Sequence, residues 1–512
     1  MRRSGERPQW RALGAWRSRD KAVCGIISAL HVAAGTLGAF DQAMEVTGNN
    51  VANSSTPGYV EQTQTFDAMP FDVGTGLVGG VRTGEVVSAR DQYAEQAVWQ
   101  QNSLLGQSTQ DVNSLTSLQN NFAISGDSGI SAALNSLYQS FSAWGQSPTD
   151  TNARQTVLNQ AESVASAFQQ TATGLATLTQ NTEQQLQQTV STVNQLVGQL
   201  QGYNTQILNG DRNDAGLDAQ VYSTLEQLSQ YVNISATKQA DGSMTVMAEG
   251  QTPLLIGATQ YQLSYQLEQP TNPPPTYSDG PPTAHILSAV GTDITGTITT
   301  GQLGSLLNLR NNTLPAYIGD AYQQGDLNAM AQQFADRVNQ LLTSGNISDA
   351  TGDTAAVTGV ALFTYDTNPD GTADATNVAQ SLAVNPSITA GQLAAIDPGP
   401  PEVSNGIALT LANLATPQDA ADEIDGESFT QYYGAMASQV GSDLSTATNG
   451  QTVQQSALAQ AQNLRQQESG VNLDQEAINL VAFQRAYEAN SHLVSVLDQI
   501  TLDTINMLTP ST

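Results

Sequence analysis

Three patterns of residues in this sequence could carry chemistry, and the first is a group of glycines. Gly74, Gly76 and Gly79 have the G-x-G-x-x-G spacing of a dinucleotide-binding loop. Such a loop needs a preceding strand and a following helix to aim backbone amides at a pyrophosphate. The residues that follow here, VRTGEVV, alternate like a strand. We therefore interpret the glycines as part of a hairpin that binds no cofactor.

The second pattern is DTNPDG at residues 366–371, which matches the opening of a calcium-binding loop. The twelfth position of that loop supplies a bidentate glutamate. Asn377 stands there instead, and Pro369 stiffens the loop. An ordinary Asp/Asn/Gly turn is the favoured interpretation, and weak calcium binding is the alternative.

The third pattern is a small set of histidines and one cysteine. His31, His285 and His492 are isolated in the sequence and lack the spacing of a metal site or a general base. Cys24 has no flanking signature of a nucleophile, and a single cysteine excludes an internal disulfide. The acidic residues are scattered, so the sequence alone does not pair them for acid–base work. We predict no catalytic residue, no metal ligand and no cofactor.

The elements that would position a site begin with helices at the two ends. Near the N-terminus, apolar or small residues recur in alternating steps of four and three, the spacing of a helix with a partner. They are Ile26, Leu30, Ala33, Leu37, Phe40, Met44, Thr47 and Val51. A longer stripe covers the C-terminus and consists of Leu473, Ala477, Leu480, Phe483, Tyr487, Val494, Leu497, Ile505 and Leu508. Both terminal segments are predicted to pack against other helices.

Between the ends, the periodicity changes several times. Helical spacing covers residues 91–121, 131–144, 151–208, 301–342 and the chain from 428 onward. Thr149 or Asp150 is placed to cap the third of these helices. The last helix is expected to break near Gly450 and again at Ser469-Gly470.

Three parts of the middle differ from the helices. Residues alternate on both sides of Asp241-Gly242, which predicts a hairpin. Residues 269–282 are rich in proline and predict a stiff linker. Residues 346–419 are rich in Gly, Asp, Thr and Pro and predict a second β-containing or irregular domain.

The predicted fold class is therefore mainly α, with the terminal helices packed as a coiled-coil-like bundle and β-containing domains inserted in the middle of the chain. We divide the chain into residues 1–22 as a non-native or misassigned extension, 23–60 with 470–512 as a terminal helical core domain, 61–230 with 300–345 and 428–469 as a helical bundle with a β-hairpin, 231–300 as a β-rich insertion, and 346–427 as a β-containing or irregular insertion.

The charge excludes some partners. The chain has 16 basic and 46 acidic residues among 512, a formal net charge of −30. Such a field repels phosphate backbones and anionic lipids, so we predict no nucleic-acid partner and no membrane partner. The sequence also has no uninterrupted run of about 18 apolar residues, the length that a membrane-spanning helix needs.

The first 21 residues differ in composition from the rest, because they contain seven of the 16 basic residues. They could be the basic region of a signal peptide, with residues 23–35 as its apolar part. The basic region is long for that role, and Gly25 and His31 interrupt the apolar part. We therefore favour a native start near Val23.

The segment GNNVANSSTPGY, residues 48–59, follows the first helix and suits a sharp turn. Asn53 can end a helix in a left-handed cap, and Pro57 prevents its continuation. Pro57 and Gly58 suit the central pair of a type II turn, which needs glycine where φ is positive. Tyr59 offers an aromatic anchor with a polar tip. The segment is predicted to end the helix and redirect the chain.

This segment resembles the N-terminal signature of flagellar rod, hook and hook-associated proteins. LVAFQRAYEANSHLVSVLDQI, residues 480–500, resembles their C-terminal signature. Three further passages are similar to the flagellar hook-associated protein 1 (FlgK) family: SGVNLDQEAINL from residue 469, the helices of residues 301–345, and the hairpin of residues 74–93. The resemblance covers most of the chain from about Ile26.

The resemblance implies a structural adaptor at the hook–filament junction, outside the cell, exported unfolded by the flagellar apparatus without a cleaved signal peptide. The implied partners are hook protein, hook-associated protein 3, further copies of the chain, and an export chaperone that binds the C-terminal helix. The implied assembly residues are Asn49, Asn50, Asn53, Thr56, Pro57, Gly58 and Tyr59 at one end and Gln484, Arg485, Tyr487, Glu488 and Asn490 at the other.

Two other functions stay open. One is another axial protein, of the hook or rod type. The other is a secreted enzyme or adhesin in which the inserted domains act, because a scaffold does not exclude a grafted site.

Overall fold

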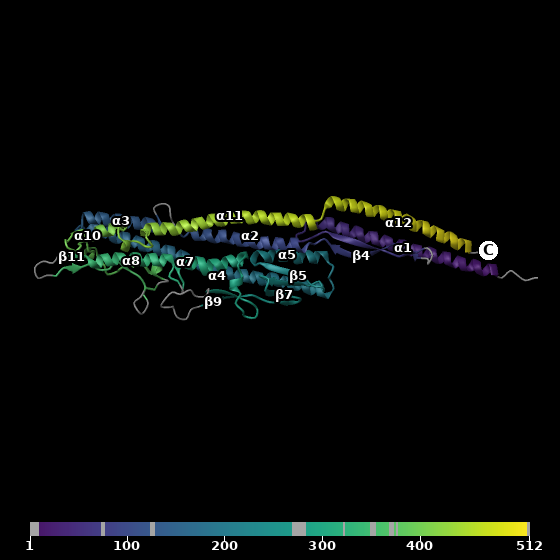
Figure 1. Cartoon of the computed structure of the whole chain (residues 1–512), viewed down its shortest axis with the longest axis horizontal. Coiled ribbons are helices and arrows are strands. Elements are labelled where there is room, and N and C mark those ends of the chain that lie inside the picture. The colour runs from purple at the N-terminus through teal and green to yellow at the C-terminus, as the bar shows by residue number, and fades with distance from the viewer. Residues whose placement is uncertain are drawn as a thin grey trace, which may run out of the picture.

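The computed structural model describes residues 10–72, 77–122, 128–268, 283–320, 323–348, 355–367, 373–374 and 377–508. The chain forms a long rod, and the first and last helices lie side by side at one end of it (Figure 1). Among the described residues, no helix is long and apolar enough to cross a membrane.

The terminal end of the rod consists of two helices and a hairpin. Helices α1 (Trp10–Asn53) and α12 (Leu473–Leu508) run antiparallel. Strands β1 (Gln62–Ala68) and β4 (Val81–Ser88) pair antiparallel and pack on α1. Three rings join the three pieces: Phe66 lies 6.0 Å from Phe40 and 6.1 Å from Phe483, between centroids. The hairpin therefore packs with the terminal helices, whereas its sequence position had placed it in the helical bundle.

The N-terminal stripe is partly used in this contact, whereas Leu473, Ala477 and Ile505 of the C-terminal stripe are exposed. Ala33 and Thr47 of the N-terminal stripe are buried, and Ala39, Ala43 and Asn50 beside it are 1% exposed. Small residues on α1 let α12 and the hairpin approach its backbone, because a side chain beyond Cβ would hold them apart. The tip of the hairpin carries the short strands β2 (Phe71–Asp72) and β3 (Leu77–Val78).

The body of the rod is built on long helices. They are α2 (Gln92–Gln119), α3 (Gly129–Gln146), α4 (Thr151–Asn209), α5 (Ala215–Tyr231) and α11 (Phe429–Ser469). Asp91, Asp150 and Asp214 cap α2, α4 and α5 by accepting hydrogen bonds from the first-turn amides. Of the two residues proposed to cap α4, Asp150 does so.

Two hydrophobic cores lie along α4. The first gathers α3, the N-terminal part of α4 and the start of α11 around Phe141, Trp144 and Phe334. The second gathers the C-terminal part of α4 and α5 under a small sheet, around Trp99 and Tyr222.

That sheet has the order β5-β6-β7-β8, with a further pair β9–β10 beside it. Their bounds are β5 Ile234–Lys238, β6 Met244–Ala248, β7 Thr252–Ile256, β8 Thr259–Gln260, β9 Ser264–Leu267 and β10 Ala284–Leu287. The hairpin predicted at Asp241-Gly242 joins β5 and β6, and Gly242 has φ +89°.

The predicted helix of residues 301–342 is divided in the structure. It becomes α6 (Gly301–Asn308), a π-helical turn (Leu309–Thr313), α7 (Leu314–Ile318) and α8 (Asp326–Ser344). The region after it has only short elements, as expected: β11 Asn346–Ser348, β12 Val357–Thr358, β13 Phe363–Thr364, α9 Val378–Ser381, β14 Ala383–Val384 and α10 Gly406–Asn413.

The break expected near Gly450 is wrong, because α11 continues through it to Ser469. A glycine costs a helix about 1 kcal/mol, and the contact of α11 with α2 along its length outweighs that cost. The break at Ser469-Gly470 is confirmed, and there the chain passes into α12. Gly74 and Gly76, the linker of residues 269–282 and most of residues 368–376 lie outside the described residues.

Candidate assembly joint between the terminal helices and the body

The chain turns sharply where α1 ends. The Tyr59 amide donates to the Thr56 carbonyl at 3.1 Å, and Gly58 between them has φ +76°. These are the features of the type II turn that Pro57-Gly58 predicted. An added Cβ at Gly58 would lie 2.3 Å from the Ala219 carbonyl oxygen of α5. Glycine is therefore required here twice, for its φ and for close contact with the body.

The left-handed cap predicted at Asn53 is wrong, since Asn53 is not among the residues with positive φ. Its side-chain amide donates instead to the Asn49 carbonyl at 3.0 Å and to the Asn49 Oδ1 at 2.6 Å. The Thr56 hydroxyl donates to the Asn53 Oδ1 at 3.2 Å. These side chains thus add hydrogen bonds at the last helical turn, and the chain reverses later, at Gly58.

Asn50 is the centre of the joint. Its Nδ2 donates to the Gln62 carbonyl at 2.8 Å and to Glu476 Oε1 at 2.9 Å. Its Oδ1 accepts from the Gln62 amide and from the Tyr59 hydroxyl, both at 3.0 Å. An asparagine amide offers two donors and two lone pairs, so every position is used. One buried side chain thereby holds α1, the turn, β1 and α12 together.

Glu476 is the residue that the sequence reasoning missed here. It is 2% exposed, and its Oε2 has no hydrogen-bond partner within the described chain. Burial and then the charge of Glu476 raise the pKa of the Tyr59 hydroxyl, which therefore stays a donor to Asn50. The available signal was position, because Glu476 lies on the α12 face that packs toward α1, where a carboxylate needs a partner.

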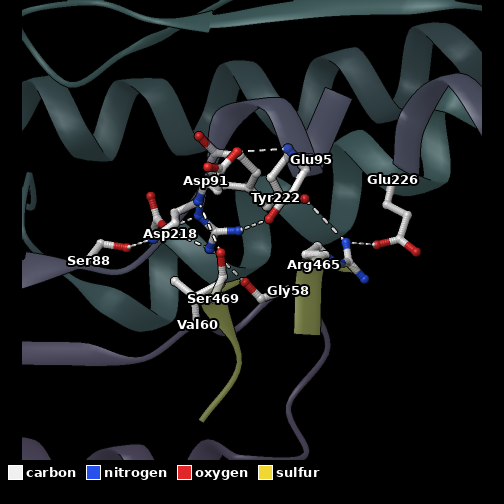
Figure 2. A network of polar contacts seen from close by, with 12 residues as sticks. Gly58, Val60, Ser88, Asp91, Glu95, Asp218, Tyr222, Glu226, Arg465 and Ser469 are labelled. Atoms are coloured by element: carbon white, nitrogen blue, oxygen red, sulfur yellow. Dashed lines mark hydrogen bonds and ion pairs between the residues drawn. The ribbon is translucent and has the colours of Figure 1, made fainter. Parts of the chain in front are cut away.

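Arg90 fastens the turn to the body, and Figure 2 labels its partners Gly58, Glu95 and Asp218. Its Nη2 donates to the Gly58 carbonyl at 2.7 Å and to Asp218 Oδ2 at 2.8 Å. Its Nη1 pairs with Glu95, and its guanidinium lies 3.6 Å above the centre of the Tyr222 ring. The side chains of Arg90 and Glu95 are 6% and 1% exposed. Burial is the largest influence on Tyr222 and raises its pKa to about 12, so the ring faces Arg90 as a neutral phenol.

Arg465 of α11 extends the network to a third helix. It lies 3.2 Å from Glu95 Oε2 and 2.7 Å from Glu226 Oε2. Glu95 therefore bridges Arg90 and Arg465, and the ion pairs connect α2, α5 and α11 around the turn (Figure 2). The composition contained a signal for such a network. With 16 basic and 46 acidic residues, a buried arginine in this chain has many carboxylates with which to pair.

Ser469 closes the other side of the joint. The Asp91 amide donates to its hydroxyl at 3.1 Å, and the Glu61 amide donates to its carbonyl at 3.0 Å. The last residue of α11 thus binds both the start of α2 and the start of the hairpin. A polar pocket of about 190 Å³ lies between the turn, Arg465 and Ser469.

Glu61 makes the joint sensitive to pH. Burial and then the charge of Glu476 raise the pKa of the Glu61 carboxyl, against a backbone hydrogen bond from Asn472. A raised pKa in the folded state means that this contribution to stability is present at low pH and is lost as the pH rises through that pKa. Glu61→Gln is therefore expected to raise the melting temperature at pH 7. The gain in the free energy of unfolding should be less than about 1 kcal/mol, since Glu61 is partly solvated.

Thermal unfolding of both proteins between pH 4 and pH 8 measures this effect, and the difference should disappear toward pH 4. Glu85→Gln is the matched control, because Glu85 is an exposed carboxylate on the same hairpin. An equal gain in both variants would show that net charge, and not the place of Glu61, is responsible.

The five C-terminal candidate residues lie apart from this joint. Gln484, Arg485, Tyr487 and Glu488 are exposed on the middle of α12, and Asn490 is partly buried. The structure therefore does not bring them together with Asn50 and Tyr59. Of the N-terminal candidates, Asn49, Thr56 and Pro57 are exposed, whereas Asn50 is buried inside the subunit.

The other patterns form no site in the part of the chain that is described. No three His, Cys, Asp or Glu side chains there are grouped to hold a metal ion. The Asn377 amide donates to Asp366 Oδ2 at 2.7 Å. His285 Nδ1 lies 2.9 Å from Asp293 Oδ2, and His492 is exposed.

Gly58→Ala tests the close contact of the turn with α5. The new Cβ would meet backbone atoms, which give way less easily than a flexible side chain, and φ would stay in the region that disfavours alanine. Overpacking of this kind costs about 1–3 kcal/mol, and calorimetry of the full chain should register it. Gly202→Ala in α4, where nothing lies within 4 Å of the added Cβ, is the control and should be neutral or stabilising. Equal stability of the two variants would contradict the contact.

Comparison with known proteins first defines the class. The family model "Flagella basal body rod protein" matches residues 30–59, and "Flagellar basal body rod FlgEFG protein C-terminal" matches residues 464–507. These are the two segments that meet at Asn50 and Glu476. The chain is therefore one of the axial proteins of the bacterial flagellum.

Its middle identifies the family within that class. Residues 115–363 match the model "Flagellar hook-associated protein FlgK helical domain". The chain is 26% identical to flagellar hook-associated protein 1 of Bacillus subtilis strain 168, over 93% of this chain and 97% of that protein. It is 23% identical to the protein of the same name from Salmonella typhimurium strain LT2, over 91% and 97%. The chain belongs to the flagellar hook-associated protein 1 family.

A solved structure supports the fold. The flagellar hook junction protein FlgK from Burkholderia pseudomallei has a TM-score of 0.58 and 16% sequence identity to this chain. The match covers 72% of this chain and 99% of that one. It agrees with the predicted fold class, which is mainly α with β-containing parts in the middle of the chain; the structure has small antiparallel sheets there.

Proposed function

We infer that this protein is a structural adaptor of the flagellar hook–filament junction, required for the filament to assemble on the hook. The observation that carries this function is the pairing of the two terminal helices through Asn50 and Glu476, in a chain that hook-associated protein 1 relatives match over almost its whole length. A subunit that lies between the hook and the filament needs terminal helices that pack into a tube. It also needs a body that differs from that of its neighbours.

We propose that the assembly residues fall into two groups. Asn50, Gly58 and Tyr59 act inside the subunit, because they fix the angle at which the terminal helices leave the body. The exposed or partly exposed members act between subunits: Asn49, Asn53, Thr56 and Pro57 at the turn, and Gln484, Arg485, Tyr487, Glu488 and Asn490 on α12. On this proposal, residues 23–60 and 470–512 form the assembly domain, and residues 1–22 stand outside it.

The finer partners are proposals as well. We propose that the subunit meets hook protein, hook-associated protein 3 and further copies of itself, after export to the outside of the cell. Exposed apolar side chains on α12 support an export chaperone that holds this helix in a groove. We propose further that the protein has no catalytic activity of its own, which assays of the full chain for hydrolase activity would test.

Deletion of the gene tests the function directly. Cells without the protein should carry hooks that lack filaments and should release filament subunits into the medium, because the subunits have no acceptor. Restoring the intact gene is the control. Full-length filaments on the hooks of the deletion strain would refute the function, and gold labelling along the whole hook would favour the hook or rod type instead.

A further inference from the structure

Helix α12 has a second apolar face that nothing in the described chain covers. Five large side chains lie on it: Ile478, Val481, Leu493, Val496 and Ile500, which are between 43% and 62% exposed. They lie on the opposite side of α12 from Glu476 and Phe483, which face α1 and the hairpin. An exposed apolar stripe of this length on one helix indicates a protein contact.

Arg485 stands in the middle of this face, one helical turn from Val481. It forms no ion pair or hydrogen bond with any part of the chain that the structure describes. Four arginines that lie largely buried, Arg90, Arg310, Arg337 and Arg465, each pair with a carboxylate. We therefore expect the partner surface to have small or apolar side chains and a carboxylate that can pair with Arg485.

The outer face of α1 has that character. Small and acidic residues follow one another there in steps of four and three, and all are exposed: Ala34, Gly38, Asp41, Glu45, Gly48 and Ala52. A Cβ added at Gly38 or Gly48 would meet nothing within 4 Å. The face thus has small side chains with two carboxylates at its centre, and neither carboxylate has an ion pair within the described chain.

The antiparallel pairing places these groups at one height. Asn50 contacts Glu476, and Phe40 packs 6.5 Å from Phe483. At 1.5 Å of rise per residue, Arg485 therefore lies level with Gly38 to Asp41, and Glu45 is about one turn further. A second copy standing beside the first at nearly the same height would bring its Asp41 opposite Arg485.

We propose that the outer face of α12 in one copy packs on the outer face of α1 in the next copy. The five apolar side chains lie along the small residues of α1, and Arg485 sits between Asp41 and Glu45 of the neighbour. The two faces differ, so the contact is head-to-tail, and repetition around an axis gives a ring or a helix of subunits. This inference rests on the proposed function and adds the faces, the charge pair and the polarity of the contact.

Charge reversal and its rescue test the pairing. The deletion strain is complemented with Arg485→Glu, with Asp41→Arg, or with both changes on one chain. Each single variant should lose filaments on most cells, because like charges then face each other in every subunit contact, and the double variant should regain them. Arg212→Glu is the matched control, since Arg212 is an exposed arginine on the body and should leave filaments normal.

Cross-linking tests the polarity in isolated junctions. In a Cys24→Ser background, a chain with both Arg485→Cys and Asp41→Cys should give a ladder of multimers under oxidation. Either cysteine alone should give none. Dimers from Arg485→Cys alone would show a symmetric α12–α12 contact and would overturn the proposal.

The outcomes separate this inference from the proposed function. Normal filaments with Arg485→Glu, in a strain whose deletion abolishes them, would refute the contact while leaving the junction role intact. Loss of filaments that Asp41→Arg does not restore, together with retention of the protein inside the cell, would assign the face to an export partner and would also refute the contact. Filaments in the deletion strain itself would refute the function.

Discussion

Arg90→Met should lower the free energy of unfolding by about 3–5 kcal/mol, the cost of breaking a buried ion pair on one side. Methionine keeps most of the length of the side chain but leaves Glu95, which is 1% exposed, with Arg465 alone. The Gly58 carbonyl loses its donor, and the Tyr222 ring loses its cation. Denaturation of the full chain, followed by circular dichroism, measures the loss. The turn should also become sensitive to protease, since Arg90 is what fastens it to α5.

Arg82→Met is the control for that experiment. Arg82 pairs with Asp67 on the hairpin, and the two side chains are 72% and 54% exposed. Exposed pairs contribute about 0–1 kcal/mol, so this variant should unfold almost like the unchanged protein. Equal losses in the two variants would mean that the buried network does not hold the turn.

Asn50→Ala should prevent junction assembly. The change leaves the Gln62 amide and carbonyl, the Tyr59 hydroxyl and the Glu476 carboxylate without their partner. Each unpaired buried polar group costs about 1–3 kcal/mol, so the terminal helices should separate while the two cores of the body stay folded. Filament counts measure the loss of junction assembly. Hydrogen exchange at the start of α12 measures the separation of the terminal helices and should become faster.

Two further variants sharpen the interpretation of Asn50. Asn463→Ala removes an exposed asparagine from α11 and should have no effect on filaments. Asn50→Asp would set a carboxylate against Glu476, and adding Glu476→Gln should restore part of the assembly by returning a donor to that contact. If Asn50→Asp alone assembled normally, the hydrogen bond between α1 and α12 would not be needed.

The helices were predictable because their signals are local. The alternating steps along α1, the carboxylate before α4 and the change of period after Tyr231 all lie within a few residues of what they determine. The turn at Pro57-Gly58 was predictable for the same reason, since proline fixes its own φ and glycine adopts a positive φ without strain.

The joint itself was only half predictable. Asn50 could be singled out from a resemblance, but nothing in the sequence pairs it with Glu476, which lies 426 residues away. Arg90 posed the same problem, because 46 carboxylates were available to it. The place of Asn53 was missed because a side chain can cap a helix end as well as a left-handed backbone can, and the sequence does not distinguish the two.

Because Asn50 and Glu476 meet across almost the whole length of the chain, the joint works as a check on completeness. Closing so long a loop is entropically costly and slow compared with forming α3 or α4, so the body can fold while the ends are still separate. A chain truncated before residue 476 would keep both cores and most of the Arg90 network. Asn50 would keep its contacts with Tyr59 and Gln62 but would lose its contact with α12. A subunit without Glu476 lacks the hydrogen bond that pairs α1 with α12, so we expect it to be left out of the junction.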